Sequence, residues 1–106
     1  MKIPKLVVAA AFLAGGTLAL AAEKTISQKG KQFSEKELTI KKGDTLVFVN
    51  DDNIAHNVMS RSAGNTFNLG SQMPGKSTPV TFDKGGDIEV ICAIHPGMKM
   101  MVKVTD

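Results

Sequence analysis

Residues 23–106 contain no ten-residue segment in which apolar side chains recur with the spacing of an amphipathic helix. Apolar residues alternate instead. Within residues 45–50, Leu46, Phe48 and Asn50 fall on one face of an extended chain and β-branched residues fall on the other. A period of two is typical of a strand with one buried face. The pattern therefore predicts an all-β domain.

Short strands separated by turns account for most of this part of the chain. The expected strands are residues 38–40, 45–50, 79–82, 88–92 and 98–104. Glycine and aspartate in residues 41–44 and 83–86 favour tight turns. Residues 60–76, rich in Gly, Asn and Ser, are expected to form a long connection that includes a short strand or a helical turn. Strands of this length joined by such turns indicate an antiparallel sandwich or barrel.

Residues 1–22 have the three-part layout of a secretory signal peptide. Lys2 and Lys5 make a short basic start, and residues 6–14 are continuously apolar. Two glycines then break the apolar run, and small residues follow at positions 19 and 21. This layout predicts an exported protein whose first segment is removed and takes no part in the fold.

Cleavage is expected after Ala21 or Ala22, and residues 23–106 are expected to form one mature domain. The alternative is an uncleaved membrane anchor over residues 6–22, a stretch at the lower limit of bilayer-spanning length and weakened by its glycines. No cysteine lies near the cleavage site, so a lipid-anchored form is not expected. The predicted location is the periplasm, with no stable membrane insertion after processing.

Length and composition narrow the classes of function. At 106 residues the chain has room for one domain, which excludes a multidomain enzyme. Its 1 cysteine excludes an intrachain disulfide framework and a zinc site made of several thiolates. The formal net charge is +3 and falls by two when Lys2 and Lys5 are removed. Because no basic run occurs, nucleic acid is not an expected partner.

The residue types that bind soft metals are concentrated in one short motif. Cys92, His95 and Met98 form Cys-x-x-His-x-x-Met on a predicted loop between two strands, and His56 begins an earlier strand. Two imidazoles, a thiolate and a thioether are the donors of a trigonal copper site with a weak axial ligand. Taken alone, the cysteine is better explained as a buried apolar residue, and each histidine as a turn or strand-end residue. Together they use every histidine and cysteine of the chain, which favours a copper site.

At these residues the chain resembles the cupredoxins, the small blue copper proteins of the plastocyanin, pseudoazurin and amicyanin group. The matching stretches are residues 38–50, 55–58 and 92–98, and the similarity extends over essentially the whole mature chain. The short Cys-to-Met spacing is most similar to that of amicyanin. The resemblance implies an antiparallel Greek-key β-sandwich or barrel that binds one type-1 copper ion.

The resemblance also implies a role for each residue of the motif. His56, Cys92 and His95 would be the equatorial copper ligands, and Met98 would be the axial ligand. The backbone N–H of Asn57 would donate a hydrogen bond to the cysteine sulfur and so tune the reduction potential.

Two positions depart from the family pattern, and both lie near the motif. Val90 stands where the family usually has an aromatic residue, and Met100 stands where it usually has glycine. Met100 is also the alternative axial ligand, at a plastocyanin-like spacing, but the tight Pro-Gly turn after the second histidine favours Met98. Asp51 and Asp52 are interpreted as turn residues.

The function implied by the resemblance is electron transfer, not catalysis. The protein would be a monomer that shuttles single electrons between a donor and an acceptor protein, such as a dehydrogenase and a c-type cytochrome. The exposed edge of His95 would be the electron port. A small apolar patch would surround it, and its candidate residues are Ile54, Ala93, Pro96 and Gly97.

Three alternatives stay open at the level of sequence. A copper chaperone or copper buffer is suggested by the methionine-rich tail Met98, Met100 and Met101. A sandwich without metal would use the same strands for binding or structure alone. A copper enzyme would need an open coordination position or a second copper, and the chain has no spare histidine for either.

Overall fold

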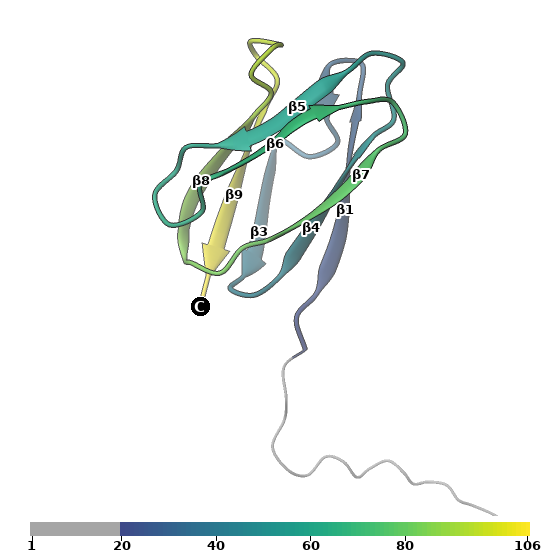
Figure 1. Cartoon of the computed structure of the whole chain (residues 1–106). Helices are drawn as coiled ribbons and strands as arrows, with labels where there is room; N and C mark the ends of the chain where they lie inside the picture. Colours follow the sequence, from purple (N-terminus) through teal and green to yellow (C-terminus); the bar gives the residue numbers. More distant parts are fainter. Residues whose placement is uncertain (1–19) are drawn as a thin grey trace, which may run out of the picture.

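The computed structural model describes residues 20–106, and every regular element in this part of the chain is a β-strand (Figure 1). In chain order the strands are β1 Glu23–Lys29, β2 Gln32–Phe33, β3 Glu37–Lys41, β4 Thr45–Asn50, β5 His56–Ser60, β6 Phe67–Gln72, β7 Ser77–Thr81, β8 Gly86–Ile91 and β9 Lys99–Thr105. The predicted all-β class is therefore confirmed.

The predicted signal peptide and its membrane-anchor alternative lie almost entirely outside the described residues. Only their last three positions, 20–22, are included. Within residues 20–106, no helix has the length and apolarity needed to cross a bilayer.

The strands form two sheets packed on a common core. One sheet has the order β2-β1-β4-β7, and the other has the order β3-β9-β8-β5-β6. Most neighbours are antiparallel, as predicted, but β1–β4 and β3–β9 run parallel. The chain leaves the first sheet after β2, forms β3 in the second sheet and returns as β4 beside β1 (Figure 1). Alternation of apolar residues shows which face of a strand is buried but not its direction, so the sequence did not distinguish these pairs.

Strands β1 and β2 are not among the strands that the sequence predicts, and β6 is the short strand that was one of two alternatives for residues 60–76. In β1, Ile26 is the one buried apolar side chain, and Gln28 is buried because its amide donates a hydrogen bond to Gln72. β6 is an edge strand within the predicted irregular stretch, with an interrupted register against β5. Such strands carry too few buried apolar residues to produce a visible alternation.

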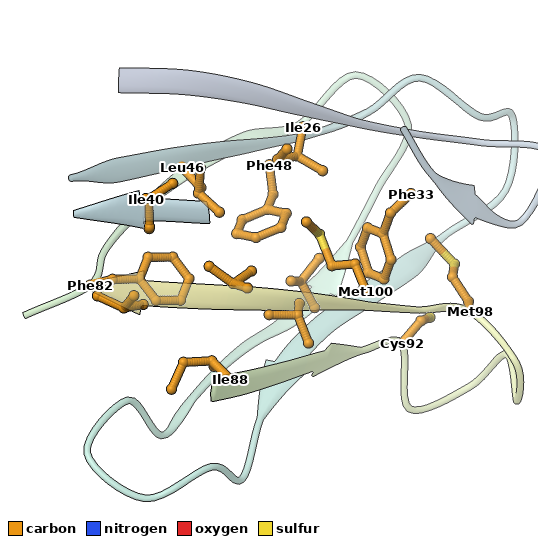
Figure 2. Close-up of a cluster of buried hydrophobic side chains, with 14 residues drawn as sticks. Ile26, Phe33, Ile40, Leu46, Phe48, Phe82, Ile88, Cys92, Met98 and Met100 are labelled. Atoms are coloured by element: carbon orange, nitrogen blue, oxygen red, sulfur yellow. The ribbon is translucent and has the colours of Figure 1, made fainter. Parts of the chain in front are cut away.

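The core lies between the two sheets and is built from the alternating positions. Leu46, Phe48 and Asn50 are all fully buried on β4, and Val102 and Val104 share the buried face of β9, as predicted. The core cluster consists of Ile26, Phe33, Ile40, Leu46, Phe48, Val58, Phe82, Ile88, Val90, Cys92, Met98, Met100, Val102 and Val104 (Figure 2). Cys92 and Met98 lie at one end of this cluster, beside each other in Figure 2.

That end of the sandwich brings two loops together. β4 ends at Asn50 and β5 begins at His56, while β8 ends at Ile91 and β9 begins at Lys99. The β4–β5 loop (residues 51–55) and the ligand loop (residues 92–98) therefore lie at the same end, away from the C-terminus (Figure 1).

Candidate metal centre

The ligand loop is closed by its own backbone hydrogen bonds. The N–H of Cys92 donates to the carbonyl of Met98 at 3.0 Å, and the N–H of Met98 donates to the carbonyl of His95 at 3.0 Å. The N–H of His95 donates back to the carbonyl of Cys92 at 3.3 Å. Gly97 has φ of 93°, a conformation that other residues rarely adopt. The short spacing of the motif thus produces a compact turn.

Three potential ligand atoms converge between the two loops. The Nδ1 atoms of His56 and His95 are 3.0 Å apart, and the Cys92 sulfur lies 3.5 Å from Nδ1 of His95 and 4.0 Å from Nδ1 of His56. His56 and Cys92 are buried, and His95 is half-buried. These three ligand atoms lie within 4.8 Å of one another, close enough to share one metal ion.

Asn57 connects the two loops. Its backbone N–H donates to the Cys92 sulfur at 3.3 Å, as the sequence analysis predicts. Its side-chain oxygen accepts from the N–H of Ala93, and its amide donates to Asn68 and to the carbonyl of Gly70. The cysteine sulfur is therefore fixed relative to β5, the strand that carries the first histidine.

A family comparison identifies this arrangement. Residues 20–105 match the family of copper binding proteins of the plastocyanin/azurin type. The chain belongs to this family. The resemblance to cupredoxins noted from the sequence is confirmed, and copper is the metal for which the site is built. The donor set fits copper, since soft sulfur and imidazole together suit both of its oxidation states.

Solved structures of similar fold are cupredoxins or contain a domain of that type. A purple cupredoxin from Nitrosopumilus maritimus is 25% identical, with a TM-score of 0.68, over 76% of this chain and 98% of that chain. A reduced amicyanin variant is 23% identical, with a TM-score of 0.70, over 76% of this chain and 79% of that chain. At that identity the amicyanin likeness shows the fold alone.

A larger protein contains a similar fold as one part. A copper-containing nitrite reductase from Thermus scotoductus SA-01 is 26% identical, with a TM-score of 0.73, over 96% of this chain. This chain covers 25% of the length of that reductase. The cupredoxin fold thus also occurs within an enzyme chain several times longer.

The two methionines proposed for the axial position both face the core. Met98 is 3% exposed and ends the ligand loop beside Cys92, whereas Met100 is 2% exposed and points into the middle of the core, toward Phe48 (Figure 2). Their similar burial follows from the alternation of a strand, which turns residues two apart to the same side.

The exposed apolar residues of the two loops and of the chain after β6 outnumber those of the predicted patch. The proposed patch residues Ile54, Ala93, Pro96 and Gly97 are exposed. Ile94 is also exposed, and so is Met73, which follows the β6 residue paired with His56. Ile94 could have been found from its place inside the Cys-x-x-His motif, but the position of Met73 depends on a pairing that the sequence does not reveal.

Asp52 is more than the turn residue that the sequence suggests. Its carboxylate accepts a hydrogen bond from Nε2 of His56 at 2.7 Å, on the side of the ring away from Cys92. The hydrogen bonds from His56 and from the N–H of Lys31 lower the pKa of Asp52 from 3.8 to about 2. The interpretation of Asp52 as a simple turn residue was therefore incomplete, because its partners are brought to it by the fold.

Proposed function

We propose that this cupredoxin is an exported one-electron carrier in which His56, Cys92 and His95 are equatorial copper ligands and Met98 is the axial ligand. The observation that carries the proposal is the convergence of two imidazole nitrogens and one sulfur within 4.8 Å. Copper bound there would supply the one-electron Cu(I)/Cu(II) couple.

The surroundings of these atoms favour electron transfer over catalysis. The ligand loop closes on itself, and Asn57 fixes the sulfur, so the donor atoms need little movement when the charge at the site changes. The chain has 2 histidines and 1 cysteine, and all three are used as donors. No histidine or cysteine is therefore left for a second copper or for acid–base chemistry.

The half-buried ring of His95 supports its role as the electron port. Its chain neighbours Ile94 and Pro96 are exposed, and so is Ile54 in the β4–β5 loop. An apolar surface with low net charge suits brief docking, because release is then fast. The partners proposed are a donor and an acceptor redox protein, such as a dehydrogenase and a c-type cytochrome, met by a monomer in the periplasm after removal of residues 1–22.

The copper chaperone or buffer is the second candidate, and the fold gives it little support. Its basis is the run of methionines at the start of β9. Met98 and Met100 are buried in the core, while Met101 is 38% exposed on the opposite face of the strand. The three thioethers therefore do not form one exposed cluster that could receive and release copper.

The deciding experiment is the visible and EPR spectrum of the copper-loaded protein with and without Cys92→Ser. The wild type should show an intense thiolate-to-copper band. The serine variant should lose it, because a hydroxyl is a harder and poorer donor than a thiolate. A serine variant that keeps the band would overturn the ligand assignment. Rapid reversible reduction with slow copper exchange would support the carrier, and the converse would support the buffer.

A further inference from the structure

The Nε2 nitrogen of His56, which faces away from the Cys92 sulfur, has a charged partner in the β4–β5 loop. His56 is fully buried, and its Nε2 lies 2.7 Å from Oδ2 of Asp52, whose side chain is 14% exposed. The same carboxylate oxygen accepts the backbone N–H of Lys31 at 3.1 Å. One acidic oxygen thus joins the buried ring to the turn between β1 and β2.

Asp52 is held in place from two directions. From outside, the N–H of Lys31 points at it because Lys31 has φ of 58°, in the left-handed region. From inside, the fully buried Asn50 accepts the N–H of Asp52 at 2.9 Å. The Asn50 amide also donates to the carbonyls of Ile54 and Gln72. The carboxylate is therefore held in place by contacts from the chain itself.

This arrangement fixes which nitrogen of His56 carries the proton. A carboxylate accepts hydrogen bonds, so Nε2 is the donor and Nδ1 keeps its lone pair. That lone pair is on the side of the ring that faces the Cys92 sulfur and Nδ1 of His95.

We propose that Asp52 is a positioning residue that holds His56 in the Nε2–H tautomer and, by its charge, stabilises the oxidised metal more than the reduced metal. The second part rests on the proposed function, since it requires copper at this site. A partner of this kind raises the basicity of a ligand imidazole, and its loss typically weakens metal binding about 10- to 100-fold.

The tautomer is tested first in the full metal-free protein by nitrogen-15 NMR of the imidazole rings. Wild-type His56 should be almost entirely the Nε2–H form, and Asp52→Ala should give a mixture of tautomers. Asp52→Asn retains an oxygen acceptor of the same shape and should keep the wild-type tautomer. An unchanged His56 tautomer in Asp52→Ala would overturn the positioning role, and this readout needs neither copper nor a redox partner.

The charge effect is tested by copper affinity and voltammetry of the same variants. Asp52→Ala should lower Cu(II) affinity about tenfold or more and Cu(I) affinity less. Each tenfold fall in the ratio of the Cu(II) affinity to the Cu(I) affinity raises the reduction potential by about 59 mV. Asp52→Asn should raise the potential as well, because it removes the charge.

Asp51→Asn is the matched control. It removes one negative charge from the neighbouring residue, whose carboxylate accepts from Ser27 and not from His56. Equal potential shifts in Asp51→Asn and Asp52→Ala would overturn the proposal in favour of a general effect of net charge. If the wild type shows the Nε2–H tautomer but no thiolate-to-copper band, the proposed function fails and the positioning role stands.

Discussion

The two loops that meet at the metal centre are held in different ways. The ligand loop is closed by hydrogen bonds among Cys92, His95 and Met98, all within seven residues of the chain. The β4–β5 loop is fixed mainly by distant residues, because Asp52 accepts from the N–H of Lys31 and the N–H of Asp51 donates to the carbonyl of Gln28. Asn50, which precedes the loop, donates to the carbonyl of Gln72 as well as to that of residue 54. One half of the site is built locally, and the other half depends on the completed fold.

This difference predicts which substitutions disturb the site. A change within the ligand loop should act mainly on the copper ligands, with any loss of stability arising in the loop itself. A change in the contacts of the β4–β5 loop or of β5 should affect both stability and the metal site. The connection between the two halves is Asn57, so the largest effect is expected there.

Asn57→Ala should weaken the connection between the ligand loop and β5. It removes the side-chain bonds to Ala93, Asn68 and Gly70. We expect a loss of about 1–3 kcal/mol in the free energy of unfolding, measured with urea, together with a shifted copper absorption band and faster copper loss.

The matched control for this variant is Asn65→Ala. Asn65 is also 8% exposed, and its amide donates to the carbonyl of Lys84, away from the metal centre. It should lose stability and keep the spectrum. If both variants shift the absorption band equally, Asn57 does not connect the loops in the way we describe.

The same contrast explains what the sequence could predict. The motif of the ligand loop was found from its spacing, and the role of each of its residues was implied by the family resemblance. His56 was placed at the start of a strand by the acidic turn that precedes it and assigned as a ligand by family resemblance. Asp52 was missed, because its acidic side chain resembles any turn residue until the fold brings Lys31 beside it.

The parts of the fold that the sequence missed share one property. β1 and the end of β6 are stabilised by buried amides, with Gln28 donating to Gln72 and Gln72 donating to the carbonyl of Phe48. A glutamine in a sequence gives no sign that it is buried, because its burial depends on a partner far along the chain. Apolar patterning therefore predicted β4 and β9, whereas it missed β1 and left β6 as one of two alternatives for residues 60–76.

Met98→Gln tests the end of the ligand loop. An axial thioether is a weak ligand that tunes the potential more than it holds the metal. We therefore expect the variant to retain copper, change colour and have a lower reduction potential by voltammetry. Met100→Leu, a volume-conserving change in the core, should leave both properties nearly unaltered. A larger potential shift for Met100→Leu would instead assign the axial position to Met100.

Gly97→Ala tests whether the ligand loop is independent of the sandwich. Gly97 has φ of 93° and Gly43, in the turn before β4, has φ of 91°; an added Cβ would meet nothing within 4 Å at either position. Both alanine variants should therefore lose about 1–2 kcal/mol of stability from backbone strain alone. Only Gly97→Ala should alter the copper spectrum, modestly. A spectral change in Gly43→Ala would show that the loop is not locally determined.

The smallest effect is expected at Asp44, in the turn that precedes β4. In the unprocessed chain, on which this prediction is tested, its carboxylate accepts the N–H groups of Ala22 and Lys41, and these hydrogen bonds lower its pKa below the ordinary 3.8. A carboxyl whose pKa is lower in the folded state contributes stability above its unfolded pKa and loses it as the pH falls through the folded value. Asp44→Asn should therefore be less stable than the wild type at neutral pH, and the difference should shrink below pH 3.8.

The spectrum of the copper-loaded variant at neutral pH should match the wild type, because this turn contacts neither loop of the metal centre. Thermal unfolding followed by circular dichroism at several pH values measures the difference, and a gap that stays constant down to low pH would show that the two hydrogen bonds do not depend on the charge of Asp44.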